Sequence, residues 1–237
     1  MNRKILITGA SRGIGFELAK ILLKKGDTVI LASRSIENSK NLDELKKISD
    51  SFFAINCDVS KSDEIDRLYN FTKENVGSID ILVNNAGRGI YAPVGTETAQ
   101  SIKEIIDLNV FGLIYLTNKF AKDMVENKGT IVNIASVAGR KGFAGLSTYC
   151  ATKWAVVGFS ESIRDELCSK GVRVITIEPG LVDTEWGENL PEAFIKYKES
   201  VDMLKPEDIA NLIDYALDAP KNVSLNEVLV RPTNQPR

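Results

Sequence analysis

Short apolar segments alternate with longer segments of helical periodicity along the whole chain, and this alternation limits the possible folds more than any other feature. The apolar segments are rich in β-branched residues and mostly uninterrupted, as strands buried on both faces of a parallel sheet are. They cover residues 3–8, 28–33, 51–57, 80–84, 130–135, 172–178 and 226–231. Helical patterns lie near residues 14–25, 61–75, 98–126, 149–169 and 206–217. The sequence therefore predicts an α/β fold, a doubly wound parallel sheet of about seven strands with helices on both faces.

We expect the chain to form one domain over residues 1–237. No linker rich in Pro, Gly or Ser divides it, and its length suits one large α/β domain. Residues 183–205 are rich in Glu and Pro and too long for a simple connection, so we expect a substrate lid there. No run approaches the roughly 18 apolar residues of a membrane span, and the first apolar run is too short for a signal peptide. These observations favour a cytoplasmic protein without a membrane partner.

The absence of histidine excludes several kinds of chemistry. Ser-His-Asp and Cys-His nucleophiles, histidine bases and histidine-containing metal sites are all ruled out. The net charge of −2 provides no basic excess for nucleic acid. The 3 cysteines form no CxxC pair, so we predict neither a disulfide framework nor a metal site. Any acid/base chemistry must use another residue type.

A glycine-rich turn separates the first predicted strand from the first predicted helix. It reads Thr8-Gly9-Ala10-Ser11-Arg12-Gly13-Ile14-Gly15. Glycines allow the tight turn and the close approach of backbone to a pyrophosphate, and the helix N-terminus presents free N–H groups to that anion. The place of the turn between strand and helix predicts a Rossmann-type dinucleotide site.

The second predicted strand ends in Ser33 and Arg34, without the carboxylate that usually holds the ribose of NAD. Arg34 and Arg12 would supply positive charge for the 2′-phosphate of NADP, and Ser33 a further hydrogen bond. Alternatively, both arginines are ordinary solvated residues. Their coincidence with the missing acid favours NADP.

Asn109, Ser136, Tyr149 and Lys153 form a candidate catalytic set. Tyr149 and Lys153 are spaced i, i+4, which places them on one face of a helix. The free tyrosine pKa of about 10 is too high for a base at neutral pH, and a neighbouring ammonium lowers it. Taken singly, each residue also has a structural explanation: a helix pair, a strand-end cap or a buried amide.

The order and spacing of these segments resemble the short-chain dehydrogenases/reductases over essentially the whole chain. The matching segments are TGASRGIG at 8–15, Asp58-Val59, NNAG at 84–87, Asn109, Ser136, YCATK at 149–153 and PGLVDT at 179–184. The resemblance implies that Tyr149 is the general acid/base, that Ser136 orients the carbonyl oxygen, and that Lys153 lowers the tyrosine pKa and holds the nicotinamide ribose. It implies that Asn109 supports a water in a proton relay.

The same resemblance implies a set of cofactor contacts. Asp58 and Val59 would flank the adenine, and Asn85, Ala86 and Gly87 would line the floor of the site. The nicotinamide end would be held by Pro179, Gly180, Val182 and Thr184. Arg12 and Arg34 match basic positions that accompany NADP preference in the family.

The chain ends in VLVRPTNQPR rather than in the glycine-rich segment of many relatives. This ending resembles a subgroup that acts on hydroxy acids and small carbonyls, and it favours a homodimer while leaving a homotetramer open. We therefore predict an enzyme that transfers a hydride between NADP(H) and a small carbonyl or secondary alcohol, with a 3-hydroxy acid as one substrate class. A 3-oxoacyl thioester reductase is the alternative. A non-catalytic NADP-binding regulator is the alternative of another class, and the four retained catalytic residues argue against it.

Two further expectations concern surfaces. A mainly apolar pocket would be lined by Ile90, Tyr91, Val137, Phe143, Leu146 and Trp186, with Arg88, Arg140 or Lys141 facing a substrate carboxylate. Residues 105–116 and 154–159 are apolar on most sides, which indicates either a partner subunit or burial by long loops. We expect Leu113 to lie on the face that meets the partner.

Overall fold

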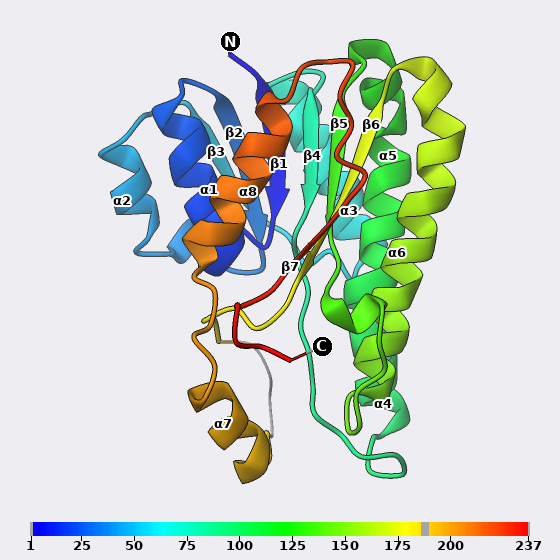
Figure 1. The fold of residues 1–237 in the computed structure, drawn as a ribbon. Coiled ribbons are helices and arrows are strands. Elements are labelled where there is room, and N and C mark those ends of the chain that lie inside the picture. Colours follow the sequence, from blue (N-terminus) through cyan, green and yellow to red (C-terminus); the bar gives the residue numbers. More distant parts are fainter. Residues whose placement is uncertain (1, 186–189, 237) are drawn as a thin grey trace.

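The computed structural model describes residues 2–185 and 190–236, and these contain one seven-stranded sheet of order β3-β2-β1-β4-β5-β6-β7 (Figure 1). The strands are β1 (Lys4–Thr8), β2 (Thr28–Ser33), β3 (Phe52–Asn56), β4 (Ile81–Asn84), β5 (Thr130–Ile134), β6 (Arg173–Pro179) and β7 (Glu227–Val230). Every neighbouring pair is parallel. The predicted single-domain, doubly wound α/β fold is confirmed.

Helices cover both faces of the sheet (Figure 1). One face carries α1 (Gly13–Lys24) and α8 (Pro206–Asp218), and the other carries α3 (Ser62–Asn75), α5 (Gly112–Asn127) and α6 (Ser147–Leu167). In β1, Ile5 and Ile7 are buried under the first group of helices and Leu6 under the second. Successive side chains of a strand point to opposite faces, so a strand between two helix layers must be apolar throughout. This explains the uninterrupted apolar runs of the sequence.

The helical pattern predicted over 98–126 is divided by a π turn. α4 (Ala99–Ile106) runs into the π turn η2 (Asp107–Phe111), which continues into α5. Two helices were not expected, α2 (Leu42–Lys46) and α7 (Glu192–Glu199). α2 is very short and α7 has no buried residue, so neither has a long apolar stripe to reveal it. None of the described helices is long and apolar enough to cross a membrane.

The strand order places a topological switch point at one end of the sheet. β2 lies on one side of β1 and β4 on the other, so the connections after β1 and β4 diverge to opposite sides. In open α/β sheets, ligands bind at such a switch point, beyond the carboxyl ends of the strands. Thr8, Ser33, Asn84, Ile134 and Pro179 are the last residues of five strands at that end.

The apolar helix faces are only partly open. Phe111 in η2 is 39% exposed and Trp154 in α6 is 52% exposed. Leu113 is 7% exposed and packs with Ala135 and Val156. The expectation that Leu113 faces a partner is therefore wrong, because its side chain points toward β5 and α6 rather than outward.

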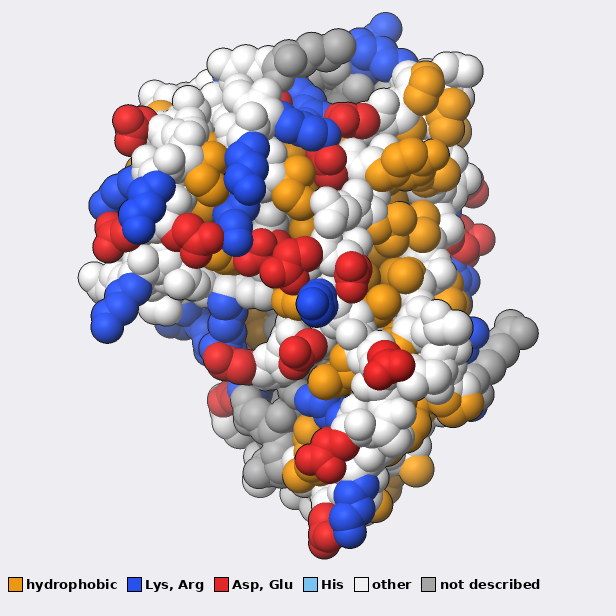
Figure 2. Space-filling model, turned by 60° about the vertical axis from the view of Figure 1, so that its left-hand side comes forward, with side chains coloured by type: hydrophobic (Ala, Val, Ile, Leu, Met, Phe, Trp, Pro, Cys, Tyr) orange, Lys and Arg blue, Asp and Glu red, His pale blue; other side chains and the backbone are white. Residues whose placement is uncertain are grey.

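Charges of both signs are mixed over the surface. Figure 2 shows Lys and Arg side chains interspersed with Asp and Glu on one face of the molecule, without a large area of one sign. Several of these charges are paired, for example Lys20 with Glu17 and Glu44, and Lys25 with Asp214. This pattern agrees with the small net charge of −2.

Candidate active site

The glycine turn after β1 lies directly against the segment after β4. Gly9 has a φ of +66°, and a Cβ built on it would lie 2.9 Å from the Cα of Ala86. A Cβ on Gly15 would lie 2.6 Å from Nδ2 of Asn85. That amide group donates to the carbonyl oxygens of Thr8 at 2.9 Å and Gly9 at 3.1 Å. Two glycines therefore let Asn85 close the turn, and a side chain at either position would open it.

The N-terminus of α1 is left open toward solvent. Arg12 precedes the helix in an extended conformation, makes no side-chain cap, and the first turn contains no acidic residue. The exposed guanidinium of Arg12 forms an ion pair with Glu185 in the segment after β6. Ser11 accepts a bond from Asn41 through its carbonyl oxygen, and Ile14 packs on the core. Unsatisfied N–H groups at such a helix end are suited to an anion.

The carboxyl ends of β2 and β3 continue the same edge of the sheet beside the glycine turn. The buried Oγ of Ser33 has no hydrogen-bond partner in the described structure, and Arg34 is exposed. Burial alone would raise the pKa of Asp58, but hydrogen bonds from Ser60 and the charges of Lys61 and Arg34 outweigh it and lower that pKa. The nearest acid after β2, Glu37, is bound to Asn56. Basic and neutral groups therefore dominate where an NAD site would carry its acid.

Tyr149 and Lys153 lie one turn apart on α6, and both are buried. The Nζ of Lys153 is 5.8 Å from the centre of the Tyr149 ring and donates to the carbonyl oxygen of Ile134 at 2.8 Å. Burial lowers the pKa of Lys153 to about 8. The end of β5 thus fixes the ammonium beside the tyrosine, as the i, i+4 spacing predicted.

Ser136 begins the turn that follows β5, the 3₁₀ turn η3 (Val137–Gly139). Its Oγ accepts from the N–H of Ala138 at 3.1 Å and donates to the carbonyl oxygen of Pro179 at 3.4 Å. A Cβ on Gly139 would lie 2.8 Å from the carbonyl oxygen of Lys153. The turn therefore packs directly on α6, next to the turn of helix that carries the tyrosine and lysine.

Asn109 lies in the π turn, 2% exposed. Its Nδ2 donates to the carbonyl oxygen of Arg88 at 2.9 Å and to Oγ1 of Thr152 at 3.1 Å, and its Oδ1 accepts from the N–H of Arg88 at 3.0 Å. A Cβ on Gly87 would lie 3.1 Å from that Oδ1 and 3.7 Å from Nζ of Lys153. Gly87 therefore lies close against both side chains, and a side chain at this position would crowd Asn109.

The segment after β6 reaches back to the glycine turn. Gly180 donates to the carbonyl oxygen of Val230 at 2.7 Å, and Val182 pairs with Leu204. The Cγ2 of Thr184 is 3.5 Å from the position of a Cβ on Gly13. The structure therefore brings the predicted residues of four segments to one end of the sheet.

Comparison with known proteins agrees with this geometry. The sequence matches the short chain dehydrogenase family over residues 3–193. The chain belongs to this family. An uncharacterised oxidoreductase of Staphylococcus saprophyticus is 32% identical, over 99% of this chain and 97% of its own length.

Two solved structures extend the comparison of this short-chain dehydrogenase. The alcohol dehydrogenase of the archaeon Thermococcus sibiricus, complexed with 5-hydroxy-NADP, is 27% identical, with a TM-score of 0.90 over 100% of this chain and 99% of the other. The serine dehydrogenase of Escherichia coli is 31% identical, with a TM-score of 0.84 over 99% of this chain and 100% of the other.

The short-chain dehydrogenase site has features that fit a nicotinamide dinucleotide. The glycine turn and the uncapped start of α1 suit its pyrophosphate. The unpartnered Oγ of Ser33 supplies a hydrogen bond that the protein itself does not use. At the catalytic end, Gly87 has no side chain to crowd Asn109 and Lys153.

Four of the residues predicted to line an apolar pocket pack together in the structure. Ile90, Tyr91, Phe143 and Leu146 form one cluster with Tyr149. Phe194 of α7 joins this cluster and was missed, because α7 has no apolar stripe that predicts its position. Val137 is half-buried outside the cluster, and Trp186 lies outside the described residues.

Two of the three cations expected to face a substrate carboxylate are engaged elsewhere. Arg140 forms a two-point ion pair with Glu178, and Arg88 pairs with Glu104 at 3.0 Å. The Nζ of Lys141 lies 5.7 Å from the centre of the Phe143 ring. Arg140 is therefore not available for the role expected of it.

Two polar residues support the site from beneath: Asn84, which the sequence suggests as a brace between adjacent strands, and Thr8, whose supporting role was not expected. Thr8 accepts at its Oγ1 from the N–H groups of Asn85 and Ala86, both at 3.1 Å. Asn84 donates to Asn133 at 2.8 Å and to Thr117 at 3.0 Å beneath the site. Polar residues at the carboxyl ends of otherwise apolar strands are the sequence signal that indicates such supporting residues.

Proposed function

We propose that this short-chain dehydrogenase interconverts a small carbonyl compound and its secondary alcohol with NADP(H), acting on 3-hydroxy acids as one substrate class. The arrangement of Tyr149 and Lys153 carries this proposal, since a buried ammonium beside a buried phenol is the acid/base system a histidine-free chain needs. The NADP-type ligand of the archaeal alcohol dehydrogenase and the name of the serine dehydrogenase support cofactor and substrate class.

When bound at this end of the sheet, NADPH would supply the hydride for reduction, and NADP⁺ would accept a hydride in the direction of oxidation. Tyr149 then gives its hydroxyl proton to the carbonyl oxygen of the substrate, and the ammonium of Lys153 stabilises the phenolate that remains. In this step the hydroxyl of Ser136 exchanges its 3.4 Å bond to Pro179 for a bond to the same carbonyl oxygen, which it orients. In the direction of oxidation, the phenolate takes the proton from the alcohol. Asn109 would hold a water that returns protons toward Lys153.

The cofactor contacts follow the placement of the segments. Gly9, Ser11, Gly13, Ile14 and Gly15 would surround the pyrophosphate, and Asp58 and Val59 would flank the adenine. Asn85, Ala86 and Gly87 would line the floor of the site. Pro179, Gly180, Val182 and Thr184 would hold the nicotinamide end. Ser33, Arg34 and Arg12 would bind the 2′-phosphate. For this, Arg12 must exchange its exposed partner Glu185 for the phosphate.

The substrate would enter the apolar cluster around Tyr149. Phe194 brings α7 to this cluster, which supports a lid over residues 183–205 that closes on the substrate. Lys141 lies beside the Phe143 ring of this cluster. A small hydroxy acid with an apolar body fits these surroundings.

The test is a substrate panel followed by NADPH absorbance. Hydroxy acids, 3-oxoacyl esters, diketones and aldehydes are offered to the wild type and to Tyr149→Phe. We expect turnover by the wild type only, with a loss of about 10³-fold or more in the variant and unchanged cofactor binding. A variant with near-normal turnover would contradict the mechanism, and a wild type inactive on the whole panel would contradict the function.

We also propose a homodimer formed through the exposed apolar residues of η2 and α6. Phe111 and Trp154 are large apolar side chains left open to solvent. Phe111→Glu should give monomers, and Val223→Glu, which changes an exposed apolar residue in the connection after α8, should not. An unchanged dimer of Phe111→Glu in analytical ultracentrifugation would contradict this interface.

A further inference from the structure

Glu178 carries a buried charge at the carboxyl end of β6, next to Pro179. The residue is 1% exposed. Arg140 donates to it through Nε at 2.8 Å and through Nη2 at 2.6 Å, and the same guanidinium lies 2.6 Å from Glu227 of β7. A buried carboxylate is stable only when it is paired and hydrogen-bonded. The buried carboxylate of Glu178 therefore depends on its ion pair with Arg140.

Arg140 is rigidly connected to Ser136. The N–H of Gly139 donates to the carbonyl oxygen of Ser136 at 2.8 Å, and the N–H of Arg140 donates to that of Val137 at 3.0 Å. The Oγ of Ser136 caps the start of the same turn by accepting from Ala138. Residues 136–140 thus form one hydrogen-bonded unit, with the serine at its start and the arginine at its end.

Ala138 of this unit is 2% exposed and packs in the cluster with Tyr149, and three further contacts link the unit to α6 and to the end of β6. Gly139 packs on the carbonyl oxygen of Lys153, Ser136 donates to Pro179 at 3.4 Å, and Arg140 binds Glu178. The first contact is only packing and the second is a long hydrogen bond. The third is a two-point, charge-assisted bond, the strongest kind among the three. Its partner Glu178 directly precedes the proline whose carbonyl receives the serine hydroxyl.

We propose that Arg140 and Glu178 are positioning residues for Ser136. Their ion pair holds the turn 136–140 on the end of β6, so that the serine hydroxyl faces the place where Tyr149 delivers its proton. Neither residue touches the substrate in this role. The inference rests on the proposed function only in so far as Ser136 acts on a substrate oxygen.

The kinetic test is a double-mutant cycle between Arg140→Met and Ser136→Ala. A misplacement of about 1 Å at a reacting group costs up to about 10²-fold, so we expect Arg140→Met to lower kcat about tenfold or more. The KM for NADPH should change less than about twofold. In the Ser136→Ala background, Arg140→Met should lower kcat by less than about twofold, because the group it positions is gone. Equal losses in both backgrounds would overturn the proposal.

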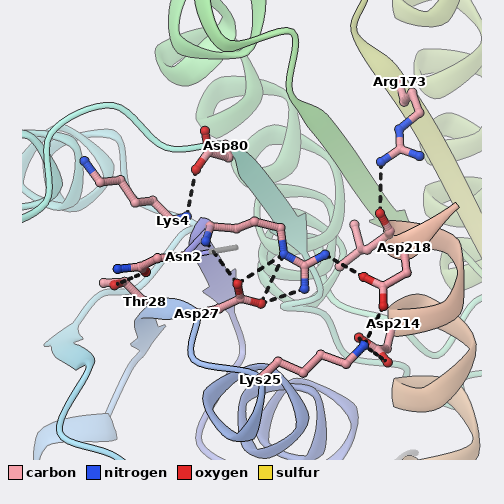
Figure 3. Close-up of polar contacts among 11 residues, drawn as sticks. Asn2, Lys4, Lys25, Asp27, Thr28, Asp80, Arg173, Asp214 and Asp218 are labelled. Atoms are coloured by element: carbon pink, nitrogen blue, oxygen red, sulfur yellow. Dashed lines mark hydrogen bonds and ion pairs between the residues drawn. The ribbon is translucent and has the colours of Figure 1, made fainter. Parts of the chain in front are cut away.

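Arg3→Met is the matched control. Arg3 binds the buried Asp27 through Nε and Nη2 and the more exposed Asp218 through Nη1, at the opposite end of the sheet (Figure 3). The Arg3→Met substitution therefore breaks a two-point ion pair with a buried carboxylate, as Arg140→Met does, but far from the site. At a temperature well below unfolding, Arg3→Met should leave kcat unchanged. A kcat loss equal to that of Arg140→Met would show a general loss of stability and overturn the positioning role.

Arg140→Met leaves Glu178 buried without its partner, and that variant can fail to fold. Arg140→Met/Glu178→Met removes both charges, a change that buried pairs often tolerate, and the same loss of kcat is expected. Arg140→Lys keeps the charge without the two-point geometry and should recover only part of kcat. Full activity of the double-methionine variant would overturn the proposal.

A readout without substrate separates this inference from the proposed function. Amide hydrogen exchange of residues 136–141 should be about tenfold faster in Arg140→Met than in the wild type, and unchanged there in Arg3→Met. A wild type inactive on every carbonyl would refute the proposed function while this exchange result stands. Unchanged exchange in Arg140→Met would refute the positioning role even if the enzyme is active.

Discussion

The two ends of the sheet differ in how many of their polar groups are paired within the protein. Where the strands begin, Arg3 binds Asp27 and Asp218, and Lys25 binds Asp214 and Asp218 (Figure 3). Where the strands finish, the Oγ of Ser33 has no partner and the start of α1 has no side-chain cap. Polar groups satisfied by the protein stabilise it, whereas unsatisfied groups at a cleft leave capacity for a ligand. The comparison separates the stabilising end from the binding end.

Two lysines show the difference in one measurable property. At the stabilising end, burial would lower the pKa of Lys25, but the hydrogen bonds that its ammonium donates to Asp214 and Asp218, with their charges, outweigh burial and raise that pKa. At the binding end, burial alone lowers the pKa of Lys153 to about 8. The protein balances the first charge with carboxylates and gives the second only a backbone carbonyl. The ammonium of Lys153 is therefore left to act on the neighbouring phenol.

The largest expected effect is the loss of activity in Lys153→Met. Without the ammonium, no charge at this position stabilises the phenolate of Tyr149, and we expect kcat to fall by about 10²–10³-fold at neutral pH. Lys25→Met removes a lysine at the other end and should keep kcat within about twofold. Comparable losses in both variants, measured by NADPH absorbance, would erase the distinction between the two ends.

Lys153 also predicts a pH dependence of stability. Its pKa is about 8 in the folded chain and 10.5 as the ordinary value. Between these values the unfolded chain holds a proton that the folded chain has lost, so the free energy of unfolding rises with pH, by at most about 1.4 kcal/mol per pH unit. Urea unfolding of wild type and Lys153→Met from about pH 7 to 10 measures the slope. Parallel curves would show that Lys153 does not titrate in this range.

Arg3→Met should have the next largest effect, on stability alone. It leaves Asp27, which is 0% exposed, without its two-point partner. Removing one member of a buried ion pair typically costs about 3–5 kcal/mol, and the partial exposure of Arg3 favours the lower limit. Denaturant unfolding checks the loss. A loss below about 1 kcal/mol would place the Arg3 cluster among ordinary surface ion pairs.

Cofactor choice is expected to change by a smaller factor. Arg34→Leu should weaken NADPH binding about tenfold, since a charge-assisted hydrogen bond contributes about 1.5–3 kcal/mol, while NADH binding stays nearly constant. Arg12→Leu should act in the same direction but less strongly, because Arg12 is shared with Glu185. Fluorescence titration measures both. Wild-type affinities that are equal for NADPH and NADH would refute the roles of both arginines.

The sequence predicted what depends on local periodicity. The strands and the pairing of Tyr149 with Lys153 follow from spacings within one element, and the structure shows them. The prediction that Leu113 lies at the interface was wrong. The helix is apolar on two sides, and only its packing in the fold decides which side is buried within the protomer. Asn109 is buried in a π turn, and the spacing of apolar residues in the sequence does not reveal such a turn.

The charge clusters were not predictable for a different reason. Arg3 and Asp218 are separated by 215 positions along the chain, and Arg140 and Glu178 by 38. Side chains of opposite charge occur throughout the sequence, and only the folded sheet selects which of them meet. Long-range pairing therefore explains why Arg140 was expected to face a substrate and instead binds Glu178.

The smallest expected effect is the acid response of Asp218. The hydrogen bond and charge of Lys25, with those of Arg3, lower the pKa of Asp218. A depressed carboxyl pKa stabilises the fold above the ordinary value of 3.8, and this stabilisation is lost as the pH falls through the folded pKa. Because Asp218 is half-exposed, Asp218→Asn should lose less than about 1 kcal/mol at neutral pH. The difference from wild type should vanish in acid, and Asp50→Asn, which changes another exposed acid, should show none. A difference that persists in acid would mean that the Asp218 side chain stabilises the fold through packing. Packing, rather than ion pairing, would then account for the stability of this end of the sheet.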